Sequence, residues 1–207
     1  MGSSRLRDAF PTTFLLVLLA LSVATNLVFV ARQMGWHLPS RSVQIPAVTP
    51  SDHIRGDAHA AVTIVEYGDF QCPFCATFHA SMVQLSRERR FRWVYRHFPL
   101  TTIHASALQA AEAAECAGDQ GRFWQYADAL FQRQQKLSPA ELSSIAADVG
   151  IDAAKFGPCL ASEQHRQRVL DDAQAGGARI SGTPTFYING KRFEGVLPLQ
   201  TLEQLVR

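Results

Sequence analysis

The chain has 207 residues, of which 47% are hydrophobic and 18% are charged, and its formal net charge is +2. This length and composition are those of a globular protein that can bury one sizeable core and has room for a small second one. Because the basic residues form no long run, we expect no nucleic-acid partner.

Residues 14–31 carry no charge and are mostly apolar. As a helix they would span about 27 Å, close to the thickness of a membrane's hydrocarbon core. We therefore predict that residues 1–32 are a membrane anchor, or a signal segment cleaved near Ser22-Val23-Ala24. The length favours the anchor, because the apolar region of a signal peptide is usually shorter.

Residues 33–55 are rich in proline, serine and other polar residues, so we interpret them as a linker. The folded domain is expected over residues 56–207. It starts with a strand-like run at 61–67, a helix to about Arg87 and a second strand at 91–98. This strand, helix, strand order predicts a parallel pair of strands.

Helical signals dominate residues 102–176, which we predict to be an insertion between strands. Thr102 is expected to cap its first helix, which runs through Cys116. Ser138 and Asp152 are expected to cap two later helices, the former within a capping box that has proline at the first helical position.

After the insertion, residues 185–188 are predicted to form a strand. Asn189-Gly190 favours a tight hairpin turn into a returning strand at 191–193. A last helix is expected to begin at Pro198.

Cys72-Pro73-Phe74-Cys75 places two thiols at the expected start of the helix that follows the first strand. Unpaired N–H groups and the positive end of the helix dipole lower the pKa of a cysteine at such a position. Pro73 fits the first turn, where its missing N–H costs nothing. A disulfide across so short a loop would stabilise the fold by only about 2 kcal/mol, so the motif indicates a redox centre rather than a structural bridge.

A zinc half-site is the alternative interpretation of the two cysteines. No second cysteine pair or closely spaced cysteine and histidine follows, so we predict no metal and no organic cofactor.

Gly182-Thr183-Pro184-Thr185 immediately precedes the strand at 185–188. A cis proline here would turn the chain sharply into the sheet edge, where neighbouring backbone groups can pair with an extended peptide. An ordinary loop proline is the alternative, because few such bonds are cis.

A glutamate six residues before C-P-x-C, a helical insertion, and G-T-P-T-F before an Asn-Gly turn occur here in that order. The combination resembles the DsbA-like thiol:disulfide oxidoreductases of the thioredoxin superfamily, over residues 56–207. The resemblance implies an α/β, thioredoxin-like fold with a helical insertion. In this chain an N-terminal transmembrane helix would precede that fold.

By this resemblance, Cys72 matches the exposed nucleophile and Cys75 the buried thiol that resolves the mixed disulfide. Glu66 matches a buried acid that can accept a proton from Cys75. A strand residue that faces solvent is the alternative interpretation of Glu66. Asp69 and Gln71 are expected to be loop residues only.

The resemblance also implies that Pro184 is a cis-proline facing the active site, and that the backbone of Thr183 contacts bound peptide. Pro73 and Phe74 complete the expected substrate-binding residues. Phe74 stands where the best-known oxidases of the family have histidine, so we expect a less oxidising pair here. His79, on the same helix face as Cys75, either tunes the site or is a plain surface histidine, which we favour.

Some DsbA-like proteins carry an extra structural disulfide between helices of the insertion, and Cys116 and Cys159 are the candidates here. If joined, they would stabilise the fold by about 4 kcal/mol and indicate an oxidising compartment. Two buried reduced thiols are the alternative.

The leading hypothesis is a protein-disulfide oxidoreductase that introduces or exchanges disulfides in exported, cysteine-containing proteins. The resemblance implies that a quinone-linked membrane protein reoxidises it. We expect it to be monomeric and periplasmic or otherwise extracytoplasmic, anchored in the cytoplasmic membrane by residues 14–31 or soluble after cleavage.

Two other functions are kept open. One is a reductase or isomerase that a membrane partner keeps reduced, and the absence of a separate dimerisation domain weighs against a dimeric isomerase. The other is a non-catalytic peptide-binding chaperone module whose groove is built around Pro184.

Overall fold

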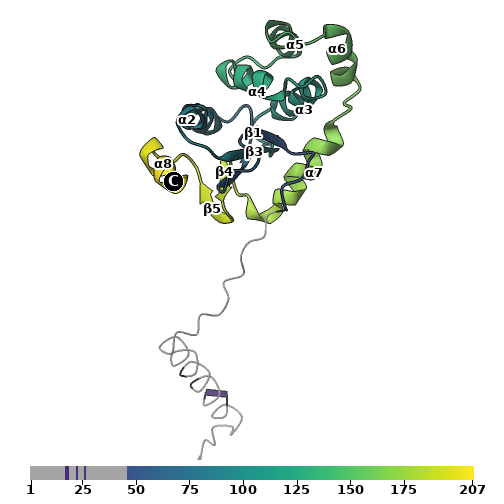
Figure 1. The fold of residues 1–207 in the computed structure, drawn as a ribbon. Helices are drawn as coiled ribbons and strands as arrows, with labels where there is room; N and C mark the ends of the chain where they lie inside the picture. The colour runs from purple at the N-terminus through teal and green to yellow at the C-terminus, as the bar shows by residue number, and fades with distance from the viewer. Residues whose placement is uncertain (1–16, 19–21, 23–25, 27–45) are drawn as a thin grey trace, which may run out of the picture. The chain divides into compact units, whose positions relative to one another are not determined.

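The computed structural model of the chain describes residues 17–18, 22, 26 and 46–207 (Figure 1). Apart from those four residues, the expected membrane segment at 14–31 lies outside the described residues, as does most of the expected linker at 33–55. Within the part that is described, no helix has the length and apolar character needed to cross a membrane.

Five strands form one mixed sheet in the order β1-β3-β2-β4-β5. β2 and β3 run parallel, as predicted, and every other neighbouring pair is antiparallel. The strands are β1 (His53–Gly56), β2 (Thr63–Gly68), β3 (Arg92–His97), β4 (Thr185–Ile188) and β5 (Lys191–Glu194).

β1 lies in a stretch that the sequence assigns mostly to the linker, so that expected boundary is too late. The strand is short and only partly buried, which leaves little alternating pattern to recognise. A buried ion pair holds the residues before it, because Arg96 Nε lies 2.8 Å from Asp52 Oδ1. A contact across 44 positions of sequence cannot be read from local composition.

Seven α-helices accompany the sheet in the described residues. They are α2 (Pro73–Glu88), α3 (Ala107–Gly118), α4 (Phe123–Gln132), α5 (Pro139–Asp148), α6 (Ala153–Ala161), α7 (Arg166–Gly176) and α8 (Leu199–Leu205), with a 3₁₀ turn at Gly177–Arg179 after α7.

The sheet lies between helices on both faces. Figure 1 shows α2 and α8 on one side and α7 on the other. Alternate strand residues face opposite sides, so Ile64 and Trp93 pack with Phe78 of α2, while Val65 and Tyr67 belong to a separate core with Ile180. The side chain of Glu66 therefore lies on the same face as Trp93 and α2.

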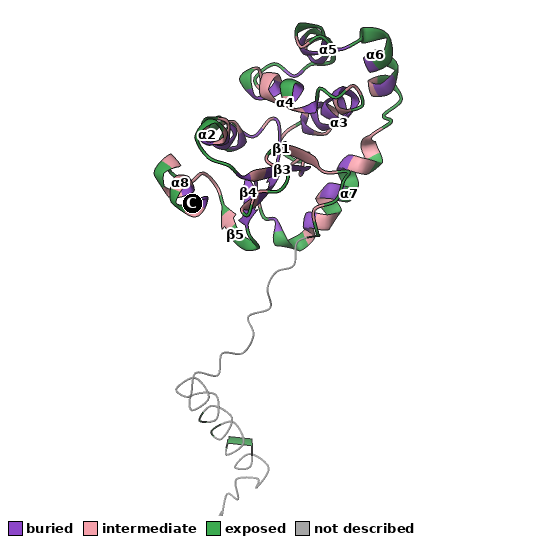
Figure 2. Cartoon of the chain, viewed as in Figure 1, coloured by how far each residue is buried: buried purple, intermediate pink, exposed green. Residues whose placement is uncertain are grey.

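α3 to α6 form the helical insertion that the sequence predicts, with its own core (Figure 1). The predicted range of 102–176 is too long, because it includes α7, which packs on the sheet beside β3. α3 is rich in alanine, and the small side chains allow close packing against α4 and α6. Figure 2 shows buried residues along α3 and exposed ones on the outer sides of α5 and α6. Cys72 and Cys75 are part of this core cluster, so the two thiols lie where the insertion meets the start of α2.

The helix caps and the hairpin turn that the sequence predicts can be compared with the structure. Ser138 accepts a hydrogen bond from the Glu141 N–H, and Asp152 caps α6 in the same way. Thr102 does not cap a helix: it lies in a turn, and α3 begins only at Ala107. The hairpin at Asn189 and Gly190 has positive φ at both residues, as a type I′ turn requires.

Candidate active site

Cys72 is the residue at which α2 begins. Its backbone is extended, with φ −72° and ψ 121°, and Pro73 occupies the first turn. No side chain among the described residues caps this end of α2, so the first N–H groups of the helix are left for the sulfur. Both Cys72 and Cys75 are free thiols and both are buried, which describes the dithiol form of the pair.

The environment of Cys72 stabilises its thiolate. A hydrogen bond from the Cys75 thiol is the largest effect and, with weaker ones from the N–H groups of Cys75 and Phe74, lowers the pKa of Cys72 to about 5. Burial acts in the opposite direction but is outweighed. A thiol with this pKa is largely ionised at neutral pH and is a ready nucleophile.

The Cys75 thiol is a much weaker acid than the Cys72 thiol. It is completely buried, and burial raises its pKa well above the ordinary value. The hydrogen bond that it gives to Cys72 and the nearby charge of Glu66 raise the pKa further. The two thiols of one motif are thus set far apart in acidity, because one lies at the helix end and the other in the core.

Glu66 is a buried carboxyl group beside this pair, which excludes the solvent-facing alternative. Trp93 Nε1 donates to its Oε2 at 2.8 Å, while its Oε1 has no hydrogen-bond partner among the described residues. Burial raises the pKa of Glu66 to about 8, although the bond from Trp93 acts against this. The group can therefore gain or lose a proton near neutral pH.

The peptide bond between Thr183 and Pro184 is cis, so the local alternative of an ordinary trans proline is wrong. The Cys72 thiol donates to the Thr183 carbonyl oxygen at 3.2 Å. Gly195 N–H donates to the Pro184 carbonyl at 2.9 Å, and Thr185 Oγ1 donates to the Gly182 carbonyl at 2.7 Å. The first of these bonds joins the proline loop to the start of α2, and the other two fix the loop itself and its contact with the residue that follows β5.

Asp69 and Gln71 do more than connect elements, which corrects the expectation for both. The carboxylate of Asp69 is buried and accepts bonds from the N–H groups of Gln71 and Leu100, at 2.7 and 2.8 Å, and it pairs with His104 Nδ1 at 2.8 Å. Gln71 Oε1 accepts the Ser106 N–H at 2.5 Å. These bonds hold the segment before α3 in turns and explain why the helix does not start at Thr102.

Gln134 is a further residue of the site that the sequence does not reveal. α4 ends at Gln132, and the Nε2 of Gln134 donates to the carbonyl oxygens of Phe70 and Cys72 at 3.3 and 3.1 Å. A glutamine after a helix carries no recognisable signal, so only the packing of the insertion on the redox loop identifies it.

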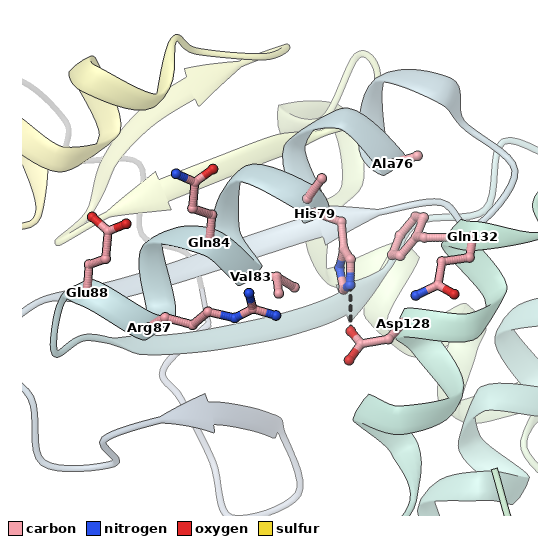
Figure 3. Close-up of a pocket in the computed structure, with 10 residues that line it drawn as sticks. Ala76, His79, Val83, Gln84, Arg87, Glu88, Asp128 and Gln132 are labelled. Atoms are coloured by element: carbon pink, nitrogen blue, oxygen red, sulfur yellow. Dashed lines mark hydrogen bonds and ion pairs between the residues drawn. The ribbon is translucent and has the colours of Figure 1, made fainter.

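His79 is not a surface histidine, contrary to the favoured expectation. Figure 3 shows it pointing from α2 toward Asp128 of α4, and its Nε2 lies 2.7 Å from Asp128 Oδ1. Burial lowers the pKa of His79 against the opposing effect of Asp128. The pair closes one end of a cleft of about 720 Å³ between the two helices, lined in part by Val83 and Gln132.

Two large apolar side chains are exposed near the motif. Phe74 is 63% exposed and follows the nucleophile by two residues, and Ile103, in the turns held by Asp69, is 71% exposed. Pro73 is also exposed. Exposed apolar groups of this size mark a candidate contact surface for another chain.

Cys116 and Cys159 are joined by a disulfide between α3 and α6. The alternative of two reduced thiols therefore does not describe this structure. The bridge lies within the insertion, because α3 and α6 both belong to it.

A family model described as Thioredoxin matches residues 48–207. The chain is also 40% identical over 166 residues to a protein of Salinispora arenicola named Na(+)/H(+) antiporter NhaA 1, a match that covers 79% of this chain and 26% of that protein. A protein of Herminiimonas arsenicoxydans named Na(+)/H(+) antiporter NhaA is 39% identical over 161 residues, covering 76% and 25%. The chain thus spans about a quarter of the length of these relatives.

Solved structures with the same fold include a thioredoxin-like oxidoreductase from Silicibacter pomeroyi. Its TM-score is 0.69 at 26% identity, with 76% of this chain and 91% of that chain covered. DsbA2 of Pseudomonas aeruginosa gives a TM-score of 0.62, also at 26% identity, with 77% and 95% covered. Because the family match spans most of the sequence, the chain belongs to the thioredoxin family, and its fold is similar to those of the thioredoxin-like oxidoreductase and of DsbA2.

Proposed function

We propose that the chain works as an oxidase, which transfers its Cys72–Cys75 disulfide to pairs of cysteines in exported proteins. A substrate thiolate attacks the Cys72 sulfur, a mixed disulfide forms, and the Cys75 sulfur leaves with the electron pair. A second substrate thiolate then attacks the substrate sulfur of the mixed disulfide and releases Cys72 as a thiolate. The substrate loses two electrons and two protons in total, and the enzyme becomes the dithiol.

The low pKa of Cys72, about 5, is the observation that supports an oxidase rather than a reductase. Stabilising the thiolate stabilises the dithiol form relative to the disulfide, so the disulfide becomes a stronger oxidant. The same stabilisation makes Cys72 a good leaving group in the last step. The alternative, a reductase or isomerase, needs a dithiol that gives up its electrons readily, and a stabilised Cys72 thiolate works against that.

Glu66 is proposed to handle the proton of Cys75. Cys75 must be protonated after it leaves, because its thiolate is strongly disfavoured in the core. With a pKa of about 8, Glu66 holds a proton at neutral pH and can donate it. Its unpartnered Oε1 leaves an atom of the carboxyl group free for this exchange.

The substrate chain is proposed to lie beside the cis-proline loop. Backbone groups of Thr183 would pair with an extended peptide, and the ring of Pro184 would lie against the mixed disulfide. Phe74 and Ile103 would contribute apolar contacts on either side, which suits an unfolded substrate with exposed apolar residues. Pro73 is exposed at the same helix end.

The proposed setting is the extracytoplasmic side of the cytoplasmic membrane, with residues 14–31 as an anchor or a cleaved signal. The disulfide between Cys116 and Cys159 supports an oxidising compartment. We propose that the chain acts as a monomer. A quinone-linked membrane protein would take the two electrons of the Cys72–Cys75 dithiol and restore the disulfide.

The test is the redox equilibrium of the Cys72–Cys75 pair with glutathione, followed by trapping of free thiols. An oxidase should have a reduction potential well above the value of about −270 mV that is typical of thioredoxin. A potential near that value would instead favour a reductase.

A second assay follows disulfide formation in a reduced peptide with two cysteines. The oxidised chain should oxidise one peptide per chain, and Cys72→Ser should abolish this. A Cys72→Ser chain that still formed the disulfide would show that the Cys72–Cys75 pair is not the oxidant. An oxidised chain that bound the peptide without oxidising it would leave the peptide-binding module as the explanation.

A further inference from the structure

We propose that the Cys116–Cys159 disulfide doubles as a redox-controlled zinc site. Once reduced, the two sulfurs join His165 and Asp119 as a four-ligand set for Zn²⁺. This inference does not depend on thiol exchange at Cys72. It rests on side chains of α3, α6 and the start of α7 that the structure already brings together.

The four candidate ligand atoms are close in space. The sulfurs of Cys116 and Cys159 and a ring nitrogen of His165 lie within 4.8 Å of one another. Asp119 Oδ2 lies 2.7 Å from His165 Nε2 and 3.9 Å from the Cys159 sulfur. Two thiolates, one imidazole and one carboxylate are ligands that zinc accepts in a tetrahedral site.

The local structure places these ligands at the ends of elements, where small movements are possible. Asp119 is the C-cap of α3, three residues after Cys116, and His165 is the N-cap of α7, six residues after Cys159. With zinc–sulfur bonds of about 2.3 Å, the two sulfurs of a tetrahedral site lie about 3.8 Å apart. Separating them to that distance requires only side-chain rotation and a slight opening between α3 and α6.

Solvent and metal can reach the cluster. The two sulfurs and Asp119 line a cleft of about 760 Å³ that Gln164 and Lys155 also border. Asp119 is 47% exposed and His165 is 17% exposed, so neither needs to be uncovered. Lys155 is the cationic side chain among those lining the cleft, and it is exposed and free to turn outward.

The chemical steps balance with a dithiol as the reductant. The dithiol is oxidised to its own disulfide, and the bond between Cys116 and Cys159 breaks to leave two thiols. Zn²⁺ then binds both sulfurs as thiolates, and two protons are released. Reoxidation of the two thiolates would expel the metal. The metal would thus hold α3 and α6 together when the disulfide is lost.

The experiment uses the full chain with Cys72→Ser and Cys75→Ser, so that Cys116 and Cys159 are the only remaining cysteines. The chain is reduced with a phosphine, and zinc binding is measured in competition with a coloured chelator. We expect one zinc per reduced chain and none per oxidised chain. Cobalt should give a thiolate-to-metal charge-transfer band in the reduced chain only.

Matched variants decide which side chains bind the metal. His165→Ala and Asp119→Asn should each weaken binding by at least about tenfold. His59→Ala and Asp171→Asn, which change exposed residues elsewhere, should leave it unchanged. The proposal is overturned if the reduced chain takes up no zinc, if the first two variants bind as tightly as the parent, or if the oxidised chain binds equally well.

A reduced chain that unfolds also tests the proposal. Circular dichroism should then show recovery of helix on addition of zinc, and this recovery should be lost in Asp119→Asn. Unfolding that zinc does not reverse would overturn the proposal.

Discussion

The sulfur of Cys72 lies 3.2 Å from the carbonyl oxygen of Thr183, although 111 positions of sequence separate the two residues. The start of α2 and the cis-proline loop therefore meet at the reactive atom. A substrate that reaches this sulfur must also lie beside the backbone of the loop. The proposed nucleophile and the proposed peptide-binding backbone are parts of one surface.

The thiolate of Cys72 should titrate near pH 5, because its pKa is lowered to about 5 from an ordinary value of 9.0. Its ultraviolet absorbance in the dithiol form should rise with that midpoint and vanish in Cys72→Ser. Cys75→Ala should move the midpoint upward, since the hydrogen bond from Cys75 is the largest cause of the shift. An unchanged midpoint in Cys75→Ala would show that the helix end alone is responsible.

Glu66→Gln should slow the steps that protonate or deprotonate Cys75, and it should remove a component of the pH–rate profile near pH 8. The carboxyl pKa is raised from 4.5 to about 8 in the folded state. The folded chain thus binds an extra proton, and its stability should fall as pH rises between about 4.5 and 8. Denaturation at several pH values should show a flatter dependence for Glu66→Gln.

The control for this change is Glu88→Gln, which alters an exposed glutamate at the end of α2. It should leave the pH–rate profile and the pH dependence of stability unchanged. A Glu66→Gln chain with an unaltered rate profile would exclude Glu66 as the proton carrier.

Phe74→His should make the pair a stronger oxidant. An imidazole at this position in the first turn of α2 can donate a hydrogen bond or positive charge to the Cys72 thiolate, whereas phenylalanine can do neither. We expect a lower pKa of Cys72 and a higher reduction potential, measured against glutathione. Gln84→His, on an exposed part of α2, serves as the control and should change neither.

Glu115→Gln should destabilise the fold by about 1–3 kcal/mol, because it weakens a buried hydrogen-bonded group. One oxygen of Glu115 lies 2.7 Å from His53 Nε2 in β1 and 2.7 Å from His97 Nε2 in β3. Burial alone would raise the pKa of Glu115, but these two bonds outweigh it and hold the pKa well below its usual range.

The lowered pKa of Glu115 determines how the stability of the fold should change with pH. A carboxyl group with a depressed pKa stabilises the fold above its unfolded pKa of about 4.5, and the contribution is lost as pH falls below it. Urea denaturation at neutral and acid pH should therefore show the parent and Glu115→Gln converging at low pH. If the free energies of unfolding of the two chains differ by the same amount at every pH, the substitution disturbs packing rather than removing a charge.

Local signals in the sequence were sufficient for the main elements. Pro73 after Cys72, Ser138 with Glu141, and Asn189 with Gly190 each act within a few residues, and the structure places a helix start or a turn at each of them. The parallel pair β2 and β3 follows from the order of elements, because a crossover helix separates them. These features depend on backbone geometry, which neighbouring residues control.

Other features have no local signal. Arg96 binds Asp52 across 44 positions, and this bond anchors β1, which the sequence places mostly in a linker. Asp69 binds the Leu100 N–H and the His104 side chain, which lie about 30 positions further along the chain. These bonds keep the residues around Thr102 in turns, so α3 starts later than Thr102. Such bonds form only when packing has brought the partners together.

The sequence by itself determined the order of elements, the paired thiols of Cys72 and Cys75 at a helix start, and the class of chemistry that they can perform. Only the tertiary structure decided the acidity of Glu66 and Cys75, because burial in the folded chain is the largest cause that raises the pKa of each. The pKa of Cys72 is instead lowered chiefly by Cys75, three residues further along the same helix start. The physical reason is the distance along the sequence over which each effect acts. Helix starts and turns depend on adjacent residues, whereas burial and charge act through space between residues that only the folded chain makes neighbours.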